Sequence, residues 1–122
     1  MKKITQGAQL IANSAVSISD FALFDLTGKN GYNSNPVLRS DITVYFLGWD
    51  RTGSPGTGGV GIHHPYGDIK KISTYSKSPT NSTCMNSNYW DISFDKTSNG
   101  FSVPENVSSG SPLINSDHKV IG

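Results

Sequence analysis

The apolar residues of this chain fall in short runs between turn residues, and no stretch repeats them at the 3.6-residue period of a capped α-helix. The strongest run is 42–49, whose β-branched and aromatic residues predict a strand. Further strands are expected at 8–12, 21–26, 61–64, 68–74, 89–94, 113–114 and 120–121. Many short strands separated by turn signals favour an all-β sandwich or barrel.

Composition agrees with this reading. Hydrophobic residues make up 34% of the chain, below the usual range, and small polar residues and glycine take their place. Segments 27–36, 51–61 and 103–111 are expected to be loops, and 115–118 is expected to turn a hairpin between the last two strands. At 122 residues the chain is one domain or part of one.

Charge and patterning exclude several classes of function. The net charge is +1, without a basic tract or an acidic tail, so nothing indicates a nucleic acid or a membrane surface as partner. No apolar run approaches the roughly 18 residues that span a bilayer. The start resembles the basic end of a signal peptide, but Gln6, Gly7 and Gln9 interrupt the apolar stretch that should follow, so no signal peptide is predicted.

No cofactor or metal site is predicted either. The glycine-rich segment 53–61 is not followed by Lys-Ser or Lys-Thr, nor by an expected helix, so it does not predict a phosphate loop. Neighbouring side chains on a strand point to opposite faces, so His63 and His64 make a poor metal pair. We expect one of them to be buried and hydrogen-bonded and the other exposed. His118 is expected to be solvated in a hairpin turn.

Segment 108–113, Ser-Ser-Gly-Ser-Pro-Leu, carries the clearest chemical signal. Small residues around Ser109, followed by Pro112, can hold an exposed hydroxyl on a tight turn while backbone N–H groups face the space in front of it. Acyl transfer needs a nucleophile beside such an oxyanion hole. Clusters of this composition are usually plain loops, so the signal depends on the rest of the chain.

Other segments support that reading through a family resemblance. Segment 19–26 (SDFALFDL) resembles the strand that carries the catalytic aspartate in trypsin-like serine peptidases, and segment 109–112 (SGSP) resembles their nucleophile turn. Between them, segments 48–51 (GWDR) and 59–73 (GVGIHHPYGDIKKIS) are similar to the lysyl endopeptidase branch of secreted bacterial proteins. Segments 89–94 and 119–122 also fit, so the resemblance covers nearly the whole chain.

The resemblance implies a trypsin-like double β-barrel with the site between the barrels. Residues 1–122 would then be a partial peptidase domain, comprising the end of the first barrel and most of the second. Ser109 would be the nucleophile, and Asp20 would orient the catalytic histidine and stabilise its charged form. The backbone N–H groups of Val107 and Ser109 would form the oxyanion hole. The substrate would be a protein or peptide cleaved after Lys or another basic residue, outside the cell; nothing predicts the oligomeric state.

Three features of the sequence differ from those expected of a complete peptidase of this family. In this family the catalytic histidine precedes the aspartate, but no histidine precedes Asp20. We therefore expect a fragment that lacks this histidine and the pocket strands after Gly122, and that is inactive alone. Cys84, the single cysteine, is a free thiol or half of a disulfide with a cysteine outside the chain; the resemblance favours the disulfide. Val107 stands where the family usually has glycine, which favours an alternative function as a catalytically inactive, protease-like β-module for binding or surface attachment.

Overall fold

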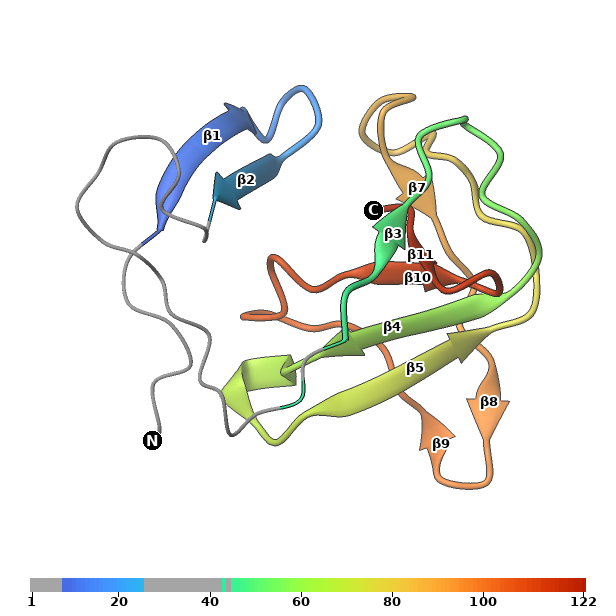
Figure 1. Cartoon of the computed structure of the whole chain (residues 1–122). Helices are drawn as coiled ribbons and strands as arrows, with labels where there is room; N and C mark the ends of the chain where they lie inside the picture. Colours follow the sequence, from blue (N-terminus) through green and yellow to red (C-terminus); the bar gives the residue numbers. More distant parts are fainter. Residues whose placement is uncertain (1–7, 26–42, 44) are drawn as a thin grey trace. The chain divides into compact units, whose positions relative to one another are not determined.

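The computed structural model describes residues 8–25, 43 and 45–122, in which every regular element is a β-strand except one short 3-10 helix (Figure 1). The all-β class expected from the sequence is therefore confirmed for these residues. Their strands form open sheets, so the double barrel stays a prediction. The chain divides into two compact units, Met1–Tyr45 and Phe46–Gly122, and each is described by itself.

The first unit contains one antiparallel hairpin, β1 (Gln9–Ser14) with β2 (Phe21–Asp25). The register runs from Ser14 opposite Phe21 to Gln9 opposite Asp25, and shifts by one residue between Leu10 and Ala12. The backbone N–H groups of residues 18, 19 and 20 all donate to the carbonyl oxygen of Ala15, which closes the connecting turn. Both strands expected here are confirmed, while the loop expected at 27–36 lies outside the described residues.

The second unit is built on a five-stranded sheet. Its spatial order is β3 (Gly48–Trp49), β11 (Lys119–Val120), β10 (Leu113–Asn115), β4 (Gly59–His63) and β5 (Lys71–Tyr75). All neighbours are antiparallel except β3 and β11, which are parallel. The pair β4 and β5 is the longest in this unit and lies at the lower edge of the sheet in Figure 1. The hairpin predicted between the last two strands is confirmed as β10 and β11.

Smaller elements surround this sheet. Helix η1 (Pro65–Gly67) connects β4 to β5, and two short hairpins follow: β6 (Thr80–Asn81) with β7 (Trp90–Asp91), and β8 (Lys96–Thr97) with β9 (Gly100–Phe101). The β8–β9 hairpin was not expected from the sequence. Its turn is closed by Thr97, whose hydroxyl accepts the Asn99 N–H and donates to the Gly100 carbonyl.

Segment 42–49, the strongest expected strand, is the main correction. Among its described residues only Gly48 and Trp49 form a strand, and Tyr45, Phe46 and Trp49 remain 76–80% exposed. Strand preference reflects packing against neighbours, and here β11 offers only two residues for pairing. Segment 89–94 was likewise too long as predicted, because only Trp90 and Asp91 pair with β6.

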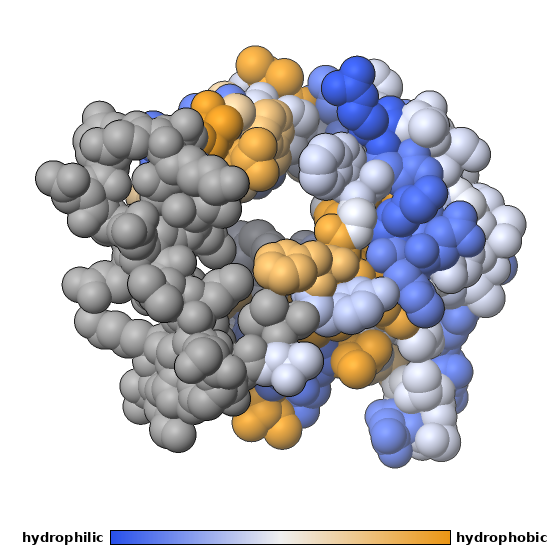
Figure 2. Space-filling model, viewed as in Figure 1, coloured by the Kyte–Doolittle hydropathy of each residue, from blue (hydrophilic) through white to orange (hydrophobic). Residues whose placement is uncertain are grey.

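The core lies where β4, β5 and β10 meet. Tyr75, Leu113 and Ile114 are its buried apolar residues, and the Tyr75 hydroxyl donates to the carbonyl oxygen of Ile114 at 3.2 Å. Burial raises the pKa of Tyr75 above its ordinary value. Many apolar side chains outside this small core are exposed, and they contribute orange surface among the hydrophilic blue in Figure 2.

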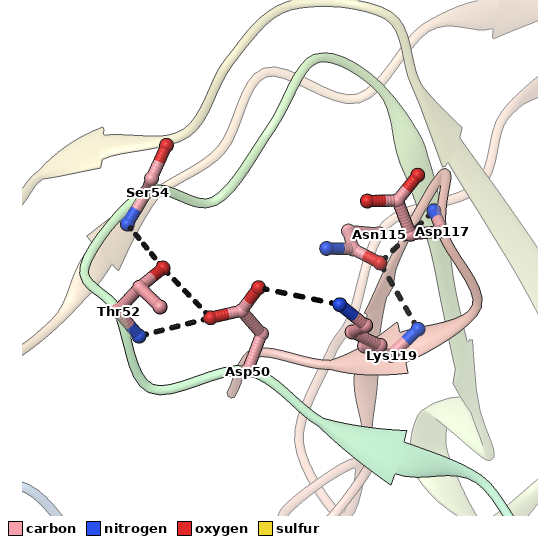
Figure 3. A network of polar contacts seen from close by, with 6 residues as sticks. All are labelled: Asp50, Thr52, Ser54, Asn115, Asp117 and Lys119. Carbon is pink, nitrogen blue, oxygen red and sulfur yellow. Dashed lines mark hydrogen bonds and ion pairs between the residues drawn. The ribbon is translucent and has the colours of Figure 1, made fainter.

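A polar network connects the end of β3 to β11 (Figure 3). The Asp50 carboxylate accepts the backbone N–H of Thr52 at 2.9 Å and its hydroxyl at 2.7 Å, and lies 3.9 Å from the Lys119 ammonium group. The Thr52 bonds, backbone first, hold the pKa of Asp50 below its ordinary value, and Lys119 adds to the effect. In the turn between β10 and β11, the Asn115 amide oxygen accepts hydrogen bonds from the backbone N–H groups of Asp117 and Lys119, and these bonds determine the shape of the turn.

Candidate active site

Two consecutive tight turns lie between β9 and β10, in a segment that we call the serine loop (residues 105–111), and Ser109 belongs to the second of them. The Ser108 N–H donates to the Glu105 carbonyl at 3.0 Å, and the Ser111 N–H donates to the Ser108 carbonyl at 3.1 Å. The Ser109 side chain is exposed, immediately after the buried Ser108. The loop therefore presents one serine hydroxyl outward and keeps its neighbour inside.

The third residue of each turn has a positive φ, as in type II turns. Gly110 has φ 81° and Val107 has φ 73°. Glycine adopts this backbone freely, but a β-branched residue there is a strained exception. Such strain typically costs about 1–3 kcal/mol. The left-handed backbone at residue 107 therefore favours glycine on physical grounds, and the valine found here is held against that preference.

A buried chain of three polar side chains anchors the serine loop to the sheet. The Ser108 hydroxyl oxygen lies 3.3 Å from Nδ1 of His63 on β4 and accepts the Glu105 backbone N–H at 3.2 Å. On the other side of the ring, His63 Nε2 lies 2.8 Å from the hydroxyl oxygen of Ser73 on β5. His63 and Ser73 are 1% exposed and Ser108 is 7% exposed.

The arrangement of the two histidines agrees with the expectation from the sequence. His63 is buried with both ring nitrogens in hydrogen-bond contact, while His64 is exposed, with Nδ1 2.9 Å from the Asp68 carbonyl oxygen. His118 is exposed in the β10–β11 turn, also as expected. Within the described ranges, no group of three metal-binding side chains could hold an ion.

A backbone bond provides a second anchor for the serine loop. The Tyr66 N–H in η1 donates to the Asn106 carbonyl at 2.8 Å. Tyr66 has φ 50°, so this bond lies between two segments that each hold a non-glycine residue in the left-handed region. Residues of this kind persist only where their surroundings hold them, and they cluster at functional sites. The backbone geometry therefore marks the contact between η1 and the serine loop as a candidate site.

A groove of about 690 Å³ adjoins this contact. It is lined by η1, by the start of β5, by the β8–β9 hairpin and by Glu105 at the beginning of the serine loop. A smaller cavity of about 320 Å³ is lined by residues that include His63, Trp90 and Pro112.

The other residues predicted to form the site have the following positions. Asp20 belongs to the first unit, where it is exposed directly before β2 with φ 42°, and its pairing with the site around Ser109 stays a prediction. In the described part of the chain, the N–H groups of Val107 and Ser109 donate no hydrogen bond, and no basic side chain lies within hydrogen-bond distance of the Ser109 hydroxyl. Cys84 is exposed, with a free thiol.

Ser73 is a member of this buried chain for which the sequence predicted no role. The available signal was period-two alternation along β5, which places Lys71, Ser73 and Tyr75 on one face and makes Ser73 a small polar residue on the inward side. The contact with His63 could not be foreseen, because it depends on how β4 and β5 pair and on where the serine loop crosses them.

Comparison with known proteins identifies a family. The family model described as lysyl endopeptidase, C-terminal domain, matches residues 1–122, the whole of this chain. No curated protein and no solved structure matches this chain. No helix among the residues that the structure describes is long and apolar enough to cross a membrane.

Proposed function

Because the chain belongs to the lysyl endopeptidase C-terminal domain family, we propose that it is part of a secreted serine endopeptidase domain with a double β-barrel fold. In this proposal the domain hydrolyses peptide bonds through an acyl-enzyme, with Ser109 as nucleophile. The observation that carries the proposal is the outward Ser109 hydroxyl on the serine loop, beside the N–H groups of Val107 and Ser109, which donate to no acceptor among the described residues.

The chemistry follows from these groups. The Ser109 oxygen attacks the carbonyl carbon of the substrate, and the two N–H groups donate to the oxyanion that forms. A histidine removes the Ser109 proton and later passes it to the leaving amine, while Asp20 holds that histidine in its reactive tautomer. Water then releases the acyl group by the same steps. The family name suggests cleavage after lysine, and cleavage after another basic residue belongs to the same proposal.

The base is a histidine other than His63. Both ring nitrogens of His63 lie in hydrogen-bond contact with buried serines, and the ring itself is 1% exposed. A side chain in that position has no free nitrogen to accept the Ser109 proton. We propose that the complete peptidase domain supplies the base from outside residues 1–122.

Val107 favours a second candidate, a catalytically inactive β-module that binds rather than cleaves. A β-branched residue at φ 73° carries strain in the segment proposed to form the oxyanion hole. Strain that displaces one donor would cost about 10²–10³ in rate.

Labelling of the complete peptidase domain with a fluorophosphonate tests the proposal. We expect one label per molecule, lost in Ser109→Ala and retained in Ser111→Ala, which removes a hydroxyl from the same loop. Asp20→Asn should lower kcat by about 10⁴-fold, as loss of the orienting aspartate does in a triad. Asp25→Asn, which removes the carboxylate at the end of β2, should leave kcat near that of the parent. A folded domain that contains the histidine but is neither labelled nor active would support the binding module instead.

A further inference from the structure

We propose that His63 is a positioning residue for the serine loop: through Ser108 it holds the backbone that presents Ser109 and its flanking N–H groups. This inference rests on the proposed function, because it assigns a task to a residue that the reaction itself does not touch. It goes beyond the triad and the oxyanion hole, since His63 lies on β4, 45 residues before Ser108.

The burial of the three side chains makes their contacts costly to break. Ser73 and His63 are 1% exposed and Ser108 is 7% exposed, so none of these groups can exchange its partner for water without the loop opening. A buried polar group that loses its partner costs about 1–3 kcal/mol. The chain of contacts therefore resists displacement of the serine loop from the sheet.

Hydrogen-bond chemistry assigns each member a defined role. A neutral imidazole has one N–H, so His63 donates to one serine and accepts the hydroxyl hydrogen of the other. In both tautomers the Ser108 oxygen also accepts the Glu105 N–H. Two partners from different directions determine the rotamer of Ser108. Its own N–H bond to the Glu105 carbonyl completes the turn.

The contact between His63 and Ser108 can affect catalysis because of the position of Ser108 in the sequence. Ser108 lies between Val107 and Ser109, whose N–H groups are the proposed oxyanion donors. Val107 holds φ 73°, a backbone that its surroundings must maintain against strain. If the His63 contact is lost, the turn at 105–108 can relax, and both donors and the Ser109 hydroxyl move with it.

Two substitutions of His63 separate its two contacts. An asparagine amide reaches about as far from the backbone as Nδ1 does and a glutamine amide about as far as Nε2, because the numbers of intervening bonds match. His63→Asn therefore retains a partner for Ser108 and loses the one for Ser73, whereas His63→Gln does the reverse. The measurement is amide hydrogen exchange in the 122-residue chain, with Ser108 and Ser111 as loop reporters and Ser82 and Asp95 as reporters elsewhere in the second unit.

We expect His63→Gln to accelerate exchange at Ser108 and Ser111 by about tenfold, the effect of losing one hydrogen bond, with a smaller change at Ser82 and Asp95. His63→Asn should stay within a few-fold of the parent at the loop reporters. Equal acceleration at all four amides in both variants would overturn the inference, because His63 would then stabilise only the sheet.

If substitutions of His63 prevent folding, two single substitutions of its serine partners test the same role of His63. Ser108→Ala and Ser73→Ala each remove one hydroxyl from the same ring, and only Ser108 is in the serine loop. Faster exchange at Ser111 in Ser108→Ala alone supports the inference, and the same change in both variants contradicts it. In the complete peptidase domain His63→Gln should lower kcat and leave KM unchanged. If that domain is inert in every form, the proposed function fails while the exchange result still decides the role of His63.

Discussion

Gly59 lies so close to Tyr75 that a Cβ atom added at residue 59 would sit 2.5 Å from the Tyr75 hydroxyl oxygen. The same atom would overlap the carbonyl oxygen of Ile114, which accepts the Tyr75 hydroxyl hydrogen. Three strands, β4, β5 and β10, therefore meet at a point where only glycine fits. Two of these strands lead directly to the candidate site, since β4 ends at His63 and β10 follows Pro112.

Replacement of Gly59 with alanine should destabilise the second unit. The neighbouring backbone must shift or the Tyr75 bond must break, and overpacking of this kind costs about 1–3 kcal/mol. Chemical denaturation followed by tryptophan fluorescence measures the change. Gly61→Ala is the matched control on the same strand, because its Cβ would meet the Phe94 ring at an ordinary 3.7 Å. A Gly59→Ala protein as stable as Gly61→Ala would contradict the close approach.

Replacement of Val107 with glycine should relieve the left-handed backbone. Strain of about 1–3 kcal/mol is removed, while the added freedom of the unfolded chain costs about 0.5–1 kcal/mol, so the net effect is a stabilisation of about 1 kcal/mol. In the complete peptidase domain kcat should rise by about tenfold or more with little change in KM, since an oxyanion donor acts mainly in the transition state.

Val107→Ala is the control for this substitution. It removes the β-branch but keeps a Cβ atom, and so it retains much of the backbone restriction. A domain that is already fast and that gains nothing from Val107→Gly would show that the oxyanion hole tolerates valine. A domain that contains its histidine and is inert in both forms would support the binding module.

The 122-residue chain should leave Ser109 unlabelled by a fluorophosphonate. Both nitrogens of His63 are in contact with the buried Ser73 and Ser108, and no basic side chain in the described part of the chain lies within hydrogen-bond distance of the Ser109 hydroxyl. Without a base the hydroxyl is a weak nucleophile. Mass spectrometry of the treated chain checks this. Stoichiometric labelling that disappears in Ser109→Ala would mean that a residue of this chain acts as the base.

Asp50 should make stability depend on pH in the acidic range. Its folded pKa is lowered from 3.8, so its stabilising effect is complete above the unfolded pKa and is lost as pH falls through the folded pKa. The expected magnitude is small, because a single carboxylate is involved and its side chain, 17% exposed, keeps part of its contact with solvent. Titration of the Asp50 carboxyl carbon by NMR should show the low pKa, and Thr52→Val should raise it only in part, because the backbone N–H of residue 52, the larger cause, remains.

An Asp50→Asn variant provides the complementary measurement. Its stability should vary less between pH 5 and pH 2 than that of the parent. Asp117→Asn, which removes another carboxylate near the same network, should keep the acid dependence contributed by Asp50. An unchanged pH profile in Asp50→Asn would contradict the assignment.

Local patterns determined a large part of this molecule. The short apolar runs at 8–12 and 21–26 predicted β1 and β2, and the apolar pairs around the polar turn at 115–118 predicted the β10–β11 hairpin. The serine, glycine and proline of segment 108–113 predicted an exposed serine on a tight turn, which is where Ser109 lies. These features depend on residues close together in the chain, whose conformational preferences can be read without knowing the neighbours in space.

Other features were decided only by the tertiary structure. Segment 42–49 has the composition of a long strand, but backbone pairing needs a partner, and β11 offers only Lys119 and Val120. The contacts of His63 with Ser73 and Ser108 depend on the register of β4 against β5 and on where the serine loop crosses these strands. The close approach of Gly59 to Tyr75 depends on the same register. Composition and periodicity are properties of one segment at a time. Pairing partners and burial belong to segments that meet only in the folded chain, and for that reason the sequence alone determined the serine turn, while the tertiary structure decided what holds it.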